Sequence, residues 1–83
     1  MAWTMNAALE AREGYVHQIV GDLNEKQKSF ARQVFQIKDL NTILQKERHL
    51  RSESSAQFFG RKDREWMLEI LAAQGDFIAR VTH

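Results

Sequence analysis

The stretch Leu23–Leu50, LNEKQKSFARQVFQIKDLNTILQKERHL, carries the clearest helical pattern in this chain. It contains neither proline nor glycine, the two residues that fit a helix interior worst. Apolar residues recur at intervals of seven, and the series extends toward the N-terminus: Leu9, Val16, Leu23, Phe30, Ile37 and Leu44. A seven-residue apolar repeat keeps one seam of a helix against a partner helix. The stretch therefore predicts a long helix over about residues 24–51, roughly 42 Å in length.

The apolar residues of this stretch do not form one narrow stripe. With about 100° between successive residues, Ile43 and Leu50 lie to one side of the seam, and Phe35 lies on the far side. Polar residues also occupy seam positions where a strict coiled coil favours leucine, namely Lys26, Gln33 and Glu47. A wide, interrupted stripe favours a bundle or a short antiparallel hairpin over a long parallel dimer.

A first helix is expected over about residues 4–20, and the sequence leaves its connection to the next helix open. Gly14 and Gly21 weaken it, because a glycine inside a helix costs up to about 1 kcal/mol. Asn24 and Gln27 have the spacing of a capping box, which favours a break or kink between Gly21 and Asn24. The unbroken seven-residue repeat supports the alternative, a single helix that runs through both segments.

A serine-rich segment over about residues 52–62 is the expected connection to the last helix. Serine side chains compete for backbone hydrogen bonds and so weaken a helix interior. Phe58 and Phe59 are adjacent, so they cannot both face the same line of the core. We expect one of them to pack into the core and the other to remain exposed for a partner.

The last helix is expected over about residues 63–81, with Asp63 as its N-cap. A dense apolar face follows at helical spacing: Trp66, Met67, Ile70, Leu71, Phe77, Ile78 and Val81. Gly75 interrupts this face and weakens the helix. We expect the apolar face to pack against the middle helix.

The size and composition indicate one helical domain that spans residues 1–83. A hydrophobic content of 43% suffices for a core, and the absence of cysteine excludes disulfides and thiolate zinc sites. No run of apolar residues reaches the length of a membrane span, and the first residues lack the pattern of a secretory signal. We therefore expect an intracellular, cytoplasmic protein.

Charge is spread unevenly along the chain. Residues 25–62 carry nine Lys and Arg against four Asp and Glu, a net charge of +5, whereas residues 1–24 and 63–83 each carry −2. A basic middle between acidic ends suits a chain that folds back on itself or binds an acidic partner. The basic residues of the middle stretch are distributed around the helix and the last helix is acidic, so nucleic-acid binding is not favoured.

Residues that carry chemistry do not form a recognisable site. His17, His49 and His83 lack the spacing of metal ligands, and Glu65 and Glu69 are one helical turn apart, as surface acids often are. No glycine-rich phosphate loop or nucleophile motif is present. The sequence therefore predicts no enzymatic activity, no metal or other cofactor, and no small-molecule ligand.

These observations predict an all-α fold, either an antiparallel helical hairpin or a small bundle of two to three helices. The expected function is non-enzymatic protein–protein interaction, by self-association or as a subunit of a helical assembly such as an adaptor or scaffold. The expected interface residues are Leu9, Val16, Leu23, Phe30, Ile37, Leu44, Phe35, Phe58 and Phe59. Two alternatives are a dimeric nucleic-acid-binding regulator and a chaperone-like or inhibitory hairpin that masks one target protein.

Overall fold

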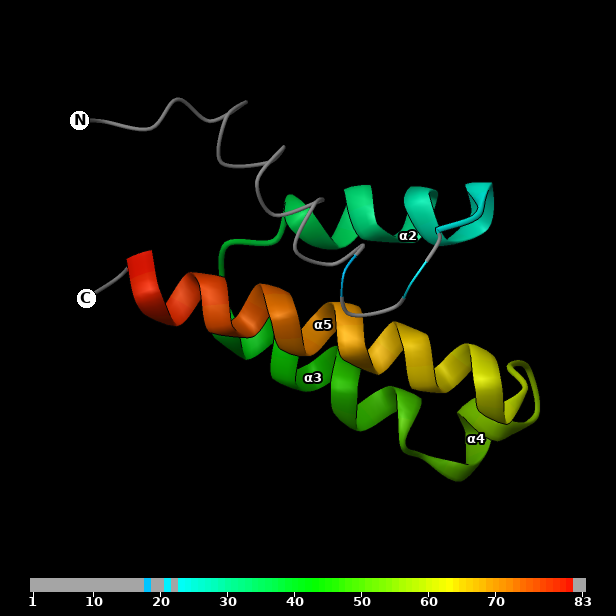
Figure 1. Cartoon of the computed structure of the whole chain (residues 1–83). Coiled ribbons are helices and arrows are strands. Elements are labelled where there is room, and N and C mark those ends of the chain that lie inside the picture. The colour runs from blue at the N-terminus through cyan, green and yellow to red at the C-terminus, as the bar shows by residue number, and fades with distance from the viewer. Residues whose placement is uncertain (1–17, 19–20, 22, 82–83) are drawn as a thin grey trace.

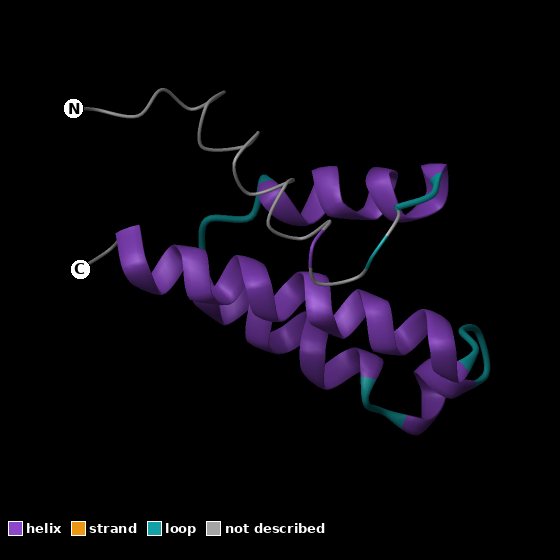
Figure 2. Cartoon of the chain, in the orientation of Figure 1, coloured by secondary structure: helices purple, strands orange, loops and turns teal. Residues whose placement is uncertain are grey.

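The structure is a computed structural model that describes Gln18, Gly21 and residues 23–81. This part of the chain contains the helices α2 (Glu25–Phe35), α3 (Leu40–Leu50), α4 (Glu53–Ala56) and α5 (Arg61–Val81), joined by turns and loops (Figures 1 and 2). The all-α prediction is therefore confirmed. The expected first helix lies outside the described residues apart from Gln18, and so do Leu9 and Val16.

Helix α5 is the centre of the arrangement, because it packs against both α3 and α2. α3 and α5 lie side by side and run in opposite directions, and α2 lies on another side of α5 (Figure 1). α4 contacts the end of α3 and leads into the turn before α5. The core between these helices consists of Leu23, Ala31, Val34, Phe35, Ile43, Leu50, Met67, Ile70, Leu71, Ala73 and Ile78.

Helix α2 begins where the capping-box spacing predicts. The Asn24 side chain accepts a hydrogen bond from the Gln27 backbone N–H at 2.9 Å, and the Gln27 side chain accepts one from the Asn24 N–H at 2.8 Å. Gly21 has a φ of 77°, a left-handed conformation that residues with a side chain rarely adopt. The predicted break between Gly21 and Asn24 is therefore confirmed, and a single helix through both segments is excluded.

The single long helix expected over about residues 24–51 is wrong. α2 ends at Phe35, residues 36–39 form a connection, and a new helix starts at Leu40. Asp39 caps this new helix, because its carboxylate accepts hydrogen bonds from the Asn41 N–H at 3.2 Å and the Thr42 hydroxyl at 3.0 Å. Ile37 therefore lies in a connection, and the seven-residue repeat does not form a continuous seam.

A buried glutamine of α5 stabilises this connection between α2 and α3. The amide nitrogen of Gln74 donates to the Ile37 carbonyl at 2.9 Å and approaches the Phe35 carbonyl at 3.4 Å. Gln74 is only 2% exposed, so these are hydrogen bonds away from water. Backbone carbonyls at the end of a helix need such partners when they are buried.

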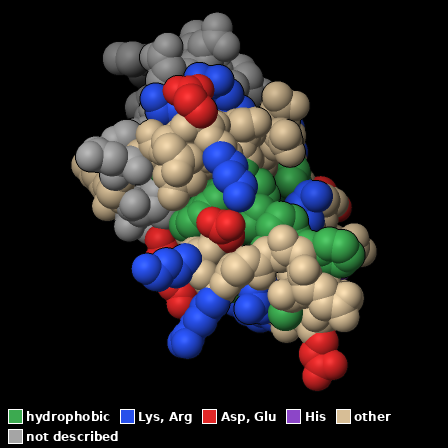
Figure 3. Space-filling view, turned by 90° about the vertical axis from the view of Figure 1, so that its right-hand side faces the viewer, with side chains coloured by type: hydrophobic (Ala, Val, Ile, Leu, Met, Phe, Trp, Pro, Cys, Tyr) green, Lys and Arg blue, Asp and Glu red, His purple; other side chains and the backbone are tan. Residues whose placement is uncertain are grey.

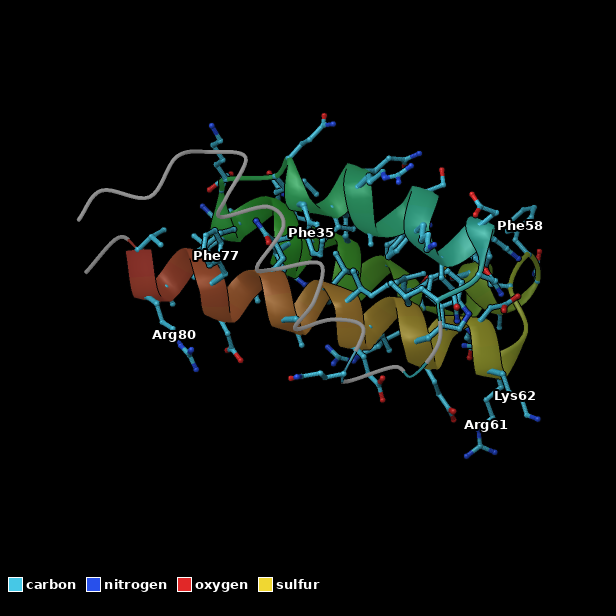
Figure 4. All side chains as sticks on the ribbon, turned by 45° about the horizontal axis from the view of Figure 1, so that its top comes forward. Phe35, Phe58, Arg61, Lys62, Phe77 and Arg80 are labelled. Carbon is cyan, nitrogen blue, oxygen red and sulfur yellow. The ribbon has the colours of Figure 1, made fainter. Side chains whose placement is uncertain are left out.

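The expected connection over residues 52–62 differs from the structure in two details. It contains the short helix α4, and α5 begins at Arg61, so Asp63 lies in the first turn instead of at the N-cap. Phe58 is 78% exposed (Figure 4), whereas Phe59 packs against the core. This confirms that the adjacent phenylalanines point to different environments.

Gly75 does not interrupt α5 and has room for a side chain. A Cβ atom there would lie 3.6 Å from Ile43 Cγ2 and Leu40 Cδ1, which is an ordinary van der Waals distance. We expect Gly75→Ala to raise the free energy of unfolding by about 0.5–1 kcal/mol, through higher helix propensity. Gly21→Ala should lower it by about 1 kcal/mol, because the added side chain disfavours the left-handed φ. Urea denaturation followed by circular dichroism measures both, and a destabilised Gly75→Ala variant would contradict the packing.

Candidate protein-binding surface

An apolar groove opens between α2, α3 and α5 near the turn that joins α4 to α5. Its walls are the side chains of Phe30, Leu50, Phe59, Met67 and Leu71, and its volume is about 390 Å³. Gln45, Lys46 and His49 of α3 complete its lining, and all three are exposed. On the face that includes this end of the molecule, hydrophobic side chains gather with charged side chains of both signs among them (Figure 3). We call the groove lined by these eight residues the apolar groove.

Phe30, which forms the α2 side of the groove, is fixed by an aromatic contact with α5. Its ring meets the Trp66 ring edge to face, with centroids 5.4 Å apart and an interplanar angle of 85°. The Trp66 indole N–H donates to the Asp63 carboxylate at 3.0 Å, and the Lys26 ammonium approaches the same carboxylate at 3.3 Å. These four side chains join the first half of α2 to the first two turns of α5 and position the groove wall.

The hydrogen bond from Trp66 and the charge of Lys26 lower the pKa of Asp63 below its ordinary value of 3.8. The unfolded chain then takes up a proton before the folded chain does as the pH falls. The stabilisation that this carboxylate supplies is therefore complete above about pH 4 and is lost as the pH falls below that value.

We expect the difference in unfolding free energy between the parent and Asp63→Asn to be constant from pH 7 to pH 5. Below about pH 4 the difference should shrink, because protonation removes the same charge that the substitution removes. Chemical denaturation at a series of pH values measures it. Asp76→Asn, which removes an exposed carboxylate from the same helix, is the matched control. An unchanged difference down to pH 2.5 would show that the Asp63 carboxylate does not stabilise the contact between α2 and α5.

The expected interface residues occupy very different environments. Leu23 and Phe35 are buried in the core, so Phe35 is not available as an exposed contact, contrary to the position the helical wheel gave it (Figure 4). Phe30, Ile37 and Phe59 are partly buried and pack against the core. Of the expected interface residues that the structure describes, only Leu44 and Phe58 are exposed, at 45% and 78%. The structure brings Phe30 and Phe59 together at the groove and places Leu44 and Phe58 elsewhere on the surface.

Three other features of the surface were not expected from the sequence. Leu40 and Val81 are exposed at 41% and 63%, although Val81 was expected on the packed face of the last helix. Arg51, Arg61 and Arg64 line a second pocket beside the groove. Arg61 and Arg64 are three residues apart on one helix, a spacing that places them on one face. Arg51 follows α3 and comes near them only because the chain folds back.

The described part of the chain shows no grouping of three or more His, Asp or Glu side chains that suits a metal ion. None of its helices combines the length and apolar character that crossing a bilayer requires. Comparisons with protein-family models, with curated proteins and with solved structures found no match.

Proposed function

We propose that this chain is a non-enzymatic, intracellular protein-binding module that receives an amphipathic helix of a partner in the apolar groove. The observation that carries the proposal is the groove, whose walls are five apolar side chains from α2, α3, α5 and the turn before α5. A partner helix that buries its apolar face in such a groove keeps its polar face in water. Burial of apolar area on both sides supplies the favourable free energy.

Charge supports an acidic helix as the occupant. Lys46 lies at the edge of the groove with His49, and no acidic residue lines the groove within the described part of the chain. Carboxylates beside the apolar face of a partner helix would therefore meet positive charge and no repulsion. A second copy of this chain is one source of such a segment, because the sequence of residues 1–24 combines a net charge of −2 with Leu9 and Val16.

A pair of synthetic peptides tests the proposal directly. Both have leucine at the a and d positions of three heptads, and the flanking e and g positions are glutamate in one and lysine in the other. Trp66 touches Phe30 at the groove, so its fluorescence in a Trp3→Phe background reports an occupant. We expect saturable binding of the glutamate peptide and much weaker binding of the lysine peptide.

Charge reversal at the edge of the groove supplies the control. Lys46→Glu should weaken binding of the glutamate peptide about fivefold, whereas Lys38→Glu, an exposed position outside the groove, should not. Light scattering across a dilution series, with circular dichroism on the same samples, tells whether a second copy occupies the groove. A chain that stays monomeric and binds neither peptide would refute the proposal.

A further inference from the structure

The second pocket, beside the apolar groove, differs from it in chemistry. It has a volume of about 310 Å³ and is lined by Leu50, Arg51, Arg61, Arg64, Glu65 and Leu68. Three of these six side chains are guanidinium groups, which remain charged at every physiological pH. We call this feature the arginine pocket.

The three arginines come from two places in the fold. Arg51 is the residue that ends α3, whereas Arg61 and Arg64 lie in the first turn of α5. The positive end of the α5 dipole therefore adds to the charge of the same region. Arg61 and Lys62 project from this end of α5, and Arg80 projects from the other end of the same helix (Figure 4).

The carboxylates near Arg51 and Arg61 form only long ion pairs with them. Arg51 lies 3.5 Å from Glu47 and Arg61 lies 3.4 Å from Glu65, each one helical turn away. Arg61 and Glu65 are both exposed, and an exposed pair of this kind contributes about 0–1 kcal/mol, whereas Glu47 beside Arg51 is only 15% exposed. A stronger anion can therefore displace Glu65 from Arg61 at little cost.

Arg64 lacks even such a partner. Its Nε atom is buried and has no hydrogen-bond partner among the described residues. Since this atom is out of reach of solvent, an anion in the pocket would bind the part of the Arg64 side chain that lines it.

We propose that the arginine pocket binds a phosphomonoester group. Three arginines and one glutamate give the lining a net charge of +2, which matches the charge of about −1.5 to −2 that a phosphomonoester carries near pH 7. A single carboxylate would neutralise only part of it. Guanidinium groups also match the oxygens of phosphate in geometry, with two parallel N–H donors on each. This site does not require the groove to be occupied.

Nitrogen-15 NMR of the arginine Nε–H groups tests the site in the full-length chain. Titration with inorganic phosphate should move the Arg64 resonance in a saturable way, whereas acetate and chloride at equal ionic strength should not. Arg61→Gln should weaken phosphate binding about tenfold, because it removes a charged hydrogen-bond donor from an exposed position without disturbing the core. Arg80→Gln, an exposed arginine at the other end of α5, should leave it unchanged.

Two further binding measurements identify the source of the phosphate group. Leu50 lines both the groove and the arginine pocket, so one peptide can reach both. Tighter binding of a phosphoserine peptide with leucine neighbours than of free phosphoserine would indicate a phosphorylated partner protein. Equal binding would indicate a free phosphorylated metabolite, and both results support the site.

Other outcomes would overturn the proposal. Equal shifts with acetate, or equal losses in Arg61→Gln and Arg80→Gln, would mean that phosphate acts only through general charge. A duplex DNA that binds more tightly than phosphoserine, with steep dependence on salt, would mean that the arginines contact phosphodiesters. A failure of phosphate binding beside intact peptide binding in the groove would refute this site and leave the proposed function in place.

Discussion

Gln74→Glu is expected to destabilise the protein by about 3 kcal/mol or more at neutral pH. The side chain of residue 74 is almost fully buried, and its amide nitrogen donates toward the carbonyls of Phe35 and Ile37. An ionised carboxylate in the same position donates nothing and directs negative charge at two carbonyl oxygens. The connection between α2 and α3 would lose its partner on α5, and a charge would be buried without compensation.

The pH dependence of this variant distinguishes lost hydrogen bonding from lost packing. Burial and the facing carbonyls raise the pKa of the introduced carboxyl. The difference in unfolding free energy between Gln74→Glu and the parent should therefore become smaller as the pH falls through that pKa. The protonated acid can again donate to a carbonyl oxygen. Gln74→Leu, which keeps the approximate shape without the donor, should cost about 1–3 kcal/mol at every pH. Urea denaturation at pH 7.5, 6 and 5 measures both variants, and a Gln74→Glu variant as stable as the parent at pH 7.5 would contradict the buried contact.

Ile43→Ala is expected to cost about 2–5 kcal/mol, whereas Leu44→Ala should cost less than about 1 kcal/mol. Ile43 is fully buried on α3, where its Cγ2 atom faces Gly75 of α5, whereas Leu44 is 45% exposed. Removing the Ile43 side chain leaves a cavity between the two helices, and removing the Leu44 side chain does not. The midpoint of thermal unfolding, recorded at equal concentration, measures both.

This pair of variants also tests the seven-residue repeat, which placed Leu44 on the seam and Ile43 beside it. Equal losses of stability would mean that α3 presents a different face to α5. A Leu44→Ala variant with unchanged stability but a smaller solution mass than the parent would place Leu44 in contact with a second chain.

Interactions between neighbouring residues determined several features of the fold that the sequence predicts. The capping box of Asn24 and Gln27 fixed the start of α2, and Gly21 supplied the left-handed residue before it, because both features depend on neighbouring residues alone. The adjacent Phe58 and Phe59 had to face different environments. Strong helical propensity with no proline made an all-α chain the expected result.

The position of the break in the long stretch depends on contacts between helices that are far apart in the sequence. The sequence over residues 36–39 contains no glycine or proline, and the seven-residue repeat runs through Ile37 without interruption. The carbonyls freed by the break find their donor in Gln74, 37 and 39 residues further along the chain. The break also changes which face of α3 meets α5, so Ile43 is buried and Leu44 is not. The apolar groove and the arginine pocket follow for the same reason: their walls come from separate helices, and only packing against α5 brings those helices together.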